Sequence, residues 1–71
     1  MATFADYKIA IRQAQQEHPQ WRLGQAAFNV LYEMRPDLSE HVRATTLDPF
    51  HRRTNEECAE FFNWVEMIWS R

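Results

Sequence analysis

The 71-residue sequence has few of the features that mark secreted or membrane-spanning proteins. Cys58 is its single cysteine, so no internal disulfide can form, and a reducing cytoplasm is the expected setting. No run of about 18 apolar residues is present, which excludes a transmembrane helix. The first residues have neither the basic nor the apolar region of a secretory signal. These absences predict a soluble, cytoplasmic protein without membrane contact.

Positive charge is also scarce. Eight Lys and Arg residues against ten Asp and Glu residues give a formal net charge of −2. Domains built to hold phosphates usually have a pI above about 9, whereas the pI of this sequence is near 5.8. The charge balance therefore favours a protein partner over a nucleic acid.

The residues that are present suit a packed core. Hydrophobic residues make up 45% of the sequence and aromatic residues 14%, with one glycine, which is not a composition typical of disorder. In so short a chain, the free energy gained by apolar burial barely exceeds the cost of ordering the chain. Most apolar residues must therefore lie in one core or at a partner interface.

Apolar residues recur at helical spacing in three segments, and prolines mark where the segments end. The first stripe predicts a helix over residues 4–17, with Thr3 as its N-cap. The second stripe begins at Leu23 and ends before Pro36, which also suits the first turn of a short helix over 37–43. A capping box at Thr54 and Glu57 predicts a last helix that runs to about residue 69.

Residues 44–53 show no helical period and predict an ordered loop. We expect Leu47 and Phe50 to anchor this loop in the core. The sequence thus predicts a single all-α domain over 1–71, a small bundle of three longer helices, one short helix and the ordered Leu-Asp-Pro-Phe loop.

A row of polar residues on the second helix could meet this loop. Arg22, Gln25 and Asn29 share one face at spacings of three and four. We expect Arg22 to pair with the carboxylate of Asp48 and Asn29 to cap loop carbonyls. The row would be a structural lock or a small recognition notch, and the lock is the preferred interpretation.

No residue pattern indicates catalysis or metal binding. The three histidines lack the spacing of a zinc site, and Cys58 lies on an apolar stripe where a buried thiol is inert. A small helical domain also has little volume for a substrate pocket of several hundred Å³. The sequence therefore predicts a non-enzymatic protein with no catalytic residue, metal or cofactor.

Large apolar side chains on the last helix exceed what a small core can cover, which indicates a protein interface. Trp64 and Met67 lie beside the core stripe of the last helix, and Tyr32 could be their neighbour from the second helix. Exposed Trp and Met are enriched at protein interfaces. We expect a homodimer or a contact with another protein, with Trp64 as its anchor. The alternative is that Trp64 belongs to the core.

A nucleic-acid-binding regulator is the second hypothesis. The corner at Pro36 resembles the turn of a helix-turn-helix. The helix over 37–43 would then read DNA, but it is short and begins with acidic residues.

Four short segments of the sequence resemble a known group of proteins. These are Arg-Leu-Gly-Gln-Ala-Ala-Phe-Asn-Val-Leu over 22–31, Pro-Asp-Leu over 36–38, Thr-Leu-Asp-Pro-Phe over 46–50, and the aromatic last helix. Together they resemble short uncharacterised proteins of tailed bacteriophages and prophages. The resemblance covers 22–69 and implies a bacterial cytoplasm and an accessory role. It also implies binding to a host or phage protein, including inhibition of a defence protein, and brings no catalytic residues.

Overall fold

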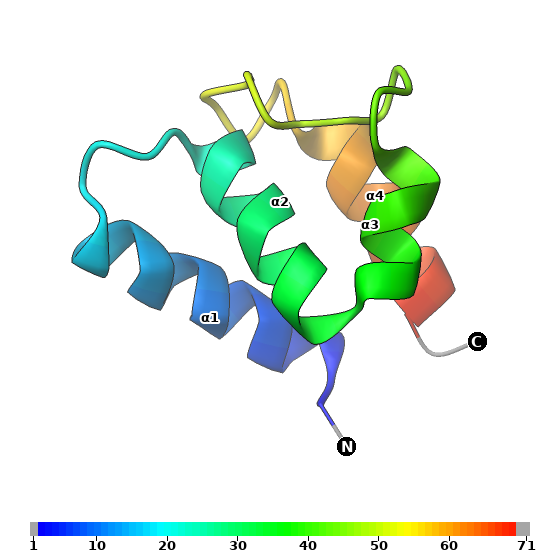
Figure 1. Ribbon diagram of the computed structural model, residues 1–71, viewed down its shortest axis with the longest axis horizontal. Coiled ribbons are helices and arrows are strands. Elements are labelled where there is room, and N and C mark those ends of the chain that lie inside the picture. The colour runs from blue at the N-terminus through cyan, green and yellow to red at the C-terminus, as the bar shows by residue number, and fades with distance from the viewer. Residues whose placement is uncertain (1, 70–71) are drawn as a thin grey trace.

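The computed structural model describes residues 2–69 and consists of four helices and their connections (Figure 1). These are α1 (Phe4–Glu17), α2 (Leu23–Met34), α3 (Pro36–Val42) and α4 (Ala59–Trp69). No strand occurs in this part of the chain. The predicted all-α bundle of three longer helices and one short helix is therefore confirmed.

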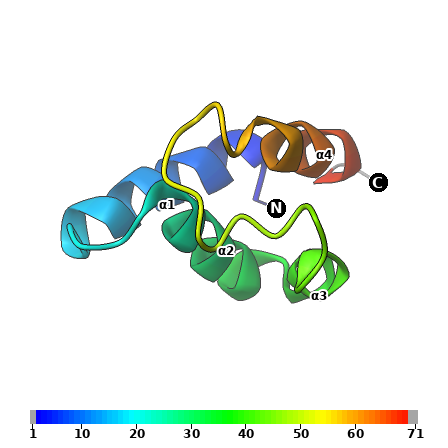
Figure 2. The ribbon, with the colours of Figure 1, turned by 90° about the horizontal axis from the view of Figure 1, so that it is seen from above.

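The helices form two layers. Seen from above, α1 and α4 lie in one layer and α2 and α3 in the other (Figure 2). The long connection from α3 to α4 passes over the N-terminal end of α2 (Figure 1). The core between the layers is built from the apolar stripes that the sequence predicts, and its fully buried side chains include Tyr7, Leu31, Val42, Phe61 and Val65.

The helix ends follow local chemistry. Thr3 and Asp6 form a reciprocal capping box at the start of α1, in which each side chain accepts a hydrogen bond from the other residue's backbone amide. Pro36 lies at the first turn of α3, where its missing amide hydrogen is not needed. A single residue, Arg35, therefore separates α2 from α3.

The predicted start of the last helix is wrong by several residues. Thr54 and Glu57 do form the predicted capping box, with the Glu57 amide 3.1 Å from Thr54 Oγ1 and the Thr54 amide 3.2 Å from Glu57 Oε1. The box closes a turn that precedes the regular helix, and α4 begins at Ala59. The Cys58 amide bonds to the Thr54 carbonyl four residues earlier, at 3.1 Å. The Ala59 amide, however, bonds to the Glu56 carbonyl only three residues earlier, so the α-helical ladder is interrupted before α4.

Tyr7 fastens α1 to α2 inside the core. Its side chain is fully buried, and its hydroxyl donates a hydrogen bond of 2.6 Å to the carbonyl oxygen of Ala27. Burial, and secondarily the nearby Cys58, raise the pKa of the Tyr7 phenol well above its usual range, so the donor stays protonated.

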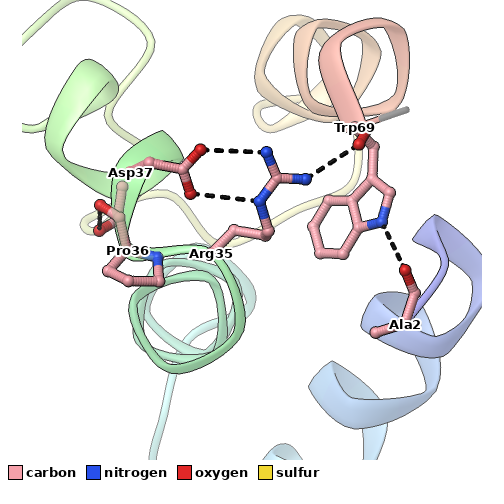
Figure 3. A network of polar contacts seen from close by, with 6 residues as sticks. Ala2, Arg35, Pro36, Asp37 and Trp69 are labelled. Atoms are coloured by element: carbon pink, nitrogen blue, oxygen red, sulfur yellow. Dashed lines mark hydrogen bonds and ion pairs between the residues drawn. The ribbon is translucent and has the colours of Figure 1, made fainter. Parts of the chain in front are cut away.

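Arg35 connects the α2–α3 corner to the ends of the chain (Figure 3). Its guanidinium donates two hydrogen bonds to the Asp37 carboxylate, at 3.0 and 3.2 Å, and a third of 2.9 Å to the Trp69 carbonyl. The Trp69 indole in turn donates to the carbonyl of Ala2 at 3.1 Å and stacks on Tyr7. Hydrogen bonding to Arg35 lowers the pKa of the Asp37 carboxyl. Arg35 and Trp69 together thus connect three segments: the α2–α3 corner, the end of α4 and the residues before α1.

We expect Arg35→Lys to lower the free energy of unfolding by about 1 kcal/mol, because a lysine ammonium group cannot form the two parallel hydrogen bonds that the planar guanidinium makes to a carboxylate. Arg43→Lys is the matched control, because a lysine there can keep the exposed pair with Glu40, at 3.3 Å, and the cation–π contacts with the Phe28 and Tyr32 rings, both at 6.0 Å. It should change stability by less than about 0.5 kcal/mol. Urea denaturation of both variants measures the difference. Equal effects of the two substitutions would contradict this role for Arg35.

The connection between α3 and α4 packs against the first turn of α2 at Gly24. The Gly24 amide donates a hydrogen bond of 2.9 Å to the Arg52 carbonyl. A Cβ atom added to Gly24 would lie 1.7 Å from the Pro49 carbonyl oxygen and 2.8 Å from that of Arg52. Both neighbours are backbone atoms, so no flexible side chain could move aside. The missing Cβ is therefore what allows this approach.

We expect Gly24→Ala to destabilise the protein by about 2 kcal/mol or more, since the loop must move away. The direction of the change in stability is informative, because helix propensity alone would make alanine more stable than glycine by about 1 kcal/mol inside a helix. Thermal denaturation beside the exposed control Glu33→Ala would measure it. A Gly24→Ala variant as stable as the parent would refute the close approach.

Candidate functional site

The predicted lock between Asp48 and the polar row of α2 is wrong. The Asp48 carboxylate accepts hydrogen bonds from the backbone amides of Ala44, at 2.9 Å, and Phe50, at 3.0 Å. Aspartate commonly satisfies turn amides in this way, and here it supports Ala44 in a left-handed conformation with φ of 59°. The loop therefore uses Asp48 internally, and Gly24 provides the contact with α2.

The polar row does not assemble into one site. The Arg22 guanidinium lies 6.0 Å from the centre of the Phe50 ring, and its Nε atom is buried without a hydrogen-bond partner in the described residues. Asn29 instead lines a notch of about 220 Å³ between α1 and α2. Gln25 is half-buried on the same helix. The predicted capping of loop carbonyls by Asn29 is absent from the hydrogen bonds within residues 2–69.

The loop anchors are partly as predicted. Leu47 and Phe50 pack against the core but remain half-buried, whereas Pro49 between them is fully buried. Phe50 meets Phe28 edge to face, with ring centres 6.1 Å apart. The sequence locates the anchoring segment correctly but assigns the deepest position to the wrong residues.

The three predicted interface residues occupy different surroundings. Trp64 is half-buried, packs against the core and stacks on the His41 ring of α3 at 6.3 Å. Met67 is 55% exposed and Tyr32 52% exposed, and Arg43 lies 6.0 Å from the Tyr32 ring. None of the aromatic contacts in residues 2–69 joins Tyr32 to Trp64. The proposed interface through these residues stays a prediction.

We expect Trp64→Ala to lower the free energy of unfolding by about 2 kcal/mol, because it removes a half-buried ring from the core surface. Met67→Ala is the exposed control on α4 and should change it by less than about 0.5 kcal/mol. Urea denaturation at several protein concentrations measures both. A midpoint that rises with concentration in the parent but not in Trp64→Ala would instead indicate a dimer through Trp64.

A groove of about 730 Å³ lies between α1, α4 and the turn that precedes α4. We call it the α1–α4 groove. Its lining consists of Phe4, Lys8, Ile11, Arg12, Gln15, Leu23, Arg53, Thr54, Asn55, Phe62, Asn63 and Glu66. This volume corrects the expectation that so small a domain has little volume for a pocket of several hundred Å³. Because α4 begins several residues later than the capping box predicts, the turn over 55–58 leaves room for the groove beside α1.

Both helices contribute regular faces to the groove. Phe4, Lys8 and Arg12 follow one another at intervals of four along α1, so they lie on adjacent turns of one face. Phe62 and Glu66 have the same spacing on α4. Ile11 is buried at the floor, and Phe4 and Phe62 are half-buried, whereas the charged side chains are exposed. The groove thus combines an apolar floor with a charged, solvent-accessible rim.

The groove was not predicted from the sequence. The spacing of Lys8 and Arg12 marks them as one face of α1 but does not distinguish them from an ordinary solvated face. Arg53 joins them only because the loop packs on Gly24, a tertiary contact without a local signal. Phe62 of α4 is half-buried, packs against the core and lines the groove.

Metal-ligating side chains do not form a cluster in the part of the chain that the structure describes. No group of three or more His, Cys, Asp or Glu side chains within residues 2–69 could hold a metal ion. Cys58 is buried, and that burial raises the pKa of its thiol. Among the helices of the same segment, none combines the length and the apolar character needed to cross a bilayer.

No family model, curated protein or solved structure matches this chain.

Proposed function

We propose that this protein is non-enzymatic and acts by binding another protein, and that the α1–α4 groove is the binding surface. The observation that carries the proposal is the composition of the groove, in which apolar side chains form the floor and exposed Lys8, Arg12 and Arg53 form the rim. Protein interfaces share this arrangement of an apolar centre and a polar rim. The partner would cover the half-buried rings of Phe4 and Phe62.

The resemblance to short phage and prophage proteins supports an accessory role in a bacterial cytoplasm. The partner would then be a host or phage protein, and a bacterial defence protein that is inhibited by the contact is one such partner. A homodimer through the same groove is the other form that a protein contact could take. The resemblance begins at Arg22, so it includes Arg53 and Phe62 but not the α1 side of the groove.

Nucleic acid is less well supported as the partner. The short helix α3 carries Asp37 and Glu40, and Arg43 at its end is paired with Glu40. A phosphate backbone would meet these carboxylates when it extends beyond the groove. Three groove cations do not form the long basic face typical of nucleic-acid-binding domains.

We expect Lys8→Gln/Arg12→Gln to lose a partner protein that the parent retains from nuclease-treated bacterial lysate. The matched control is Gln13→Glu/Gln20→Glu, which gives the same net charge but alters exposed positions outside the groove. The control should retain the partner at the parental level. Quantitative mass spectrometry of the three pull-downs measures the difference.

Equal recovery of every protein by parent and groove variant would contradict the proposal. Recovery that is lost on nuclease treatment would instead support the nucleic-acid hypothesis. Circular dichroism of both double variants checks that they remain helical, which is expected because all four positions lie at the surface.

A further inference from the structure

The Lys and Arg side chains that line the groove are exposed and form no ion pair within residues 2–69. Seven Lys and Arg side chains lie in the described residues, and four of them are engaged elsewhere. Arg35 and Arg43 pair with carboxylates, Arg52 donates to the carbonyls of Thr46 and Glu57, and Arg22 is partly buried beside Phe50. The remaining three are Lys8, Arg12 and Arg53. None of these three forms an ion pair within residues 2–69, and all three line the α1–α4 groove. Lys8 differs from the other two in that its Nζ atom lies 5.9 Å from the centre of the Phe4 ring, inside the same groove.

This distribution gives the groove a charge opposite to that of the whole protein. The rim has three cationic side chains and one carboxylate, Glu66, while the formal net charge of the chain is −2. Unpaired cations beside an apolar floor are positioned for charge-assisted hydrogen bonds to a bound carboxylate. A lower local dielectric between Phe4 and Phe62 would strengthen such bonds relative to water.

The dimensions of the groove limit the length of what it can hold. Its α1 side extends from Phe4 to Gln15, a rise of about 16 Å at 1.5 Å per residue. That length matches about three turns of a helix, or about five residues of extended chain. A groove of about 730 Å³ therefore accommodates a short peptide segment and not a whole domain.

We propose that the occupant is a short acidic, amphipathic segment of the partner protein, with apolar side chains on Phe4 and Phe62 and carboxylates at Lys8, Arg12 and Arg53. This inference rests on the proposed function and names the chemistry of its partner. Glu66 lies on the α4 side of the same groove and opposes the binding of carboxylates. Its removal should therefore strengthen the interaction that removal of Arg12 weakens.

The first test is a selection of random 12-residue peptides on the immobilised parent protein. Enriched peptides should carry net negative charge and at least two large apolar residues. The same selection on Lys8→Gln/Arg12→Gln should not enrich them. Enrichment of neutral or basic peptides, or no enrichment at all, would overturn the proposal.

The second test measures the affinity of one enriched peptide by fluorescence anisotropy. Arg12→Gln should raise Kd about threefold to tenfold, the effect of one charge-assisted hydrogen bond at a partly solvated site. Glu66→Gln should lower Kd, whereas Glu60→Gln, an exposed carboxylate of α4 outside the groove, should leave it unchanged. Raising NaCl from about 50 to about 200 mM should weaken binding.

Other outcomes are equally decisive. A Kd that is insensitive to Arg12→Gln and Glu66→Gln would refute the charge complementarity. Tighter binding of a 20-base-pair DNA duplex, lost in Arg12→Gln, would identify the groove as a nucleic-acid site instead. A groove-dependent protein partner in the pull-down, together with neutral peptides in the selection, would refute the acidic chemistry and leave the proposed function standing. Failure of both experiments would refute both.

Discussion

The contact between Gly24 and the loop before α4 is the constraint on which the rest of the molecule depends. Backbone meets backbone there, with the Gly24 amide bonded to the Arg52 carbonyl and the Pro49 carbonyl occupying the space of a side chain. A contact of this kind fixes position closely, because neither partner has a flexible side chain that could adjust. It fixes the part of the loop from Pro49 to Arg52 against the first turn of α2.

The groove is a consequence of this placement. Arg53 directly follows Arg52, whose carbonyl is bonded to Gly24, and the loop thereby places the Arg53 side chain at the rim. The other two cations, Lys8 and Arg12, lie four residues apart on one face of α1. The irregular turn over 55–58 delays α4 and leaves room beside α1. At the opposite end, Arg35 and Trp69 hold the end of α4 near the start of α1. The apolar floor of the groove therefore lies between two attachments that fix the positions of α1, α4 and the loop.

Much of the fold follows from the sequence because the relevant signals are local. Proline positions, the Thr3 cap and the apolar stripes each act over a few residues, and they predict α1, α2 and α3 closely. The partner of Asp48 was predicted wrongly because its own loop amides compete with distant Arg22, and the nearer donors are bonded. The groove could not be predicted, since its rim joins residues 8, 12 and 53 through tertiary packing.

The most direct test of this account is a nuclear Overhauser measurement on the folded parent protein. Close packing of the loop predicts cross-peaks from the amide and α protons of Gly24 to protons of residues 49–53, beside those expected within α2. Their absence in a spectrum that retains the contact between Tyr7 and Trp69 would contradict the account, because the core would then be formed without the docked loop.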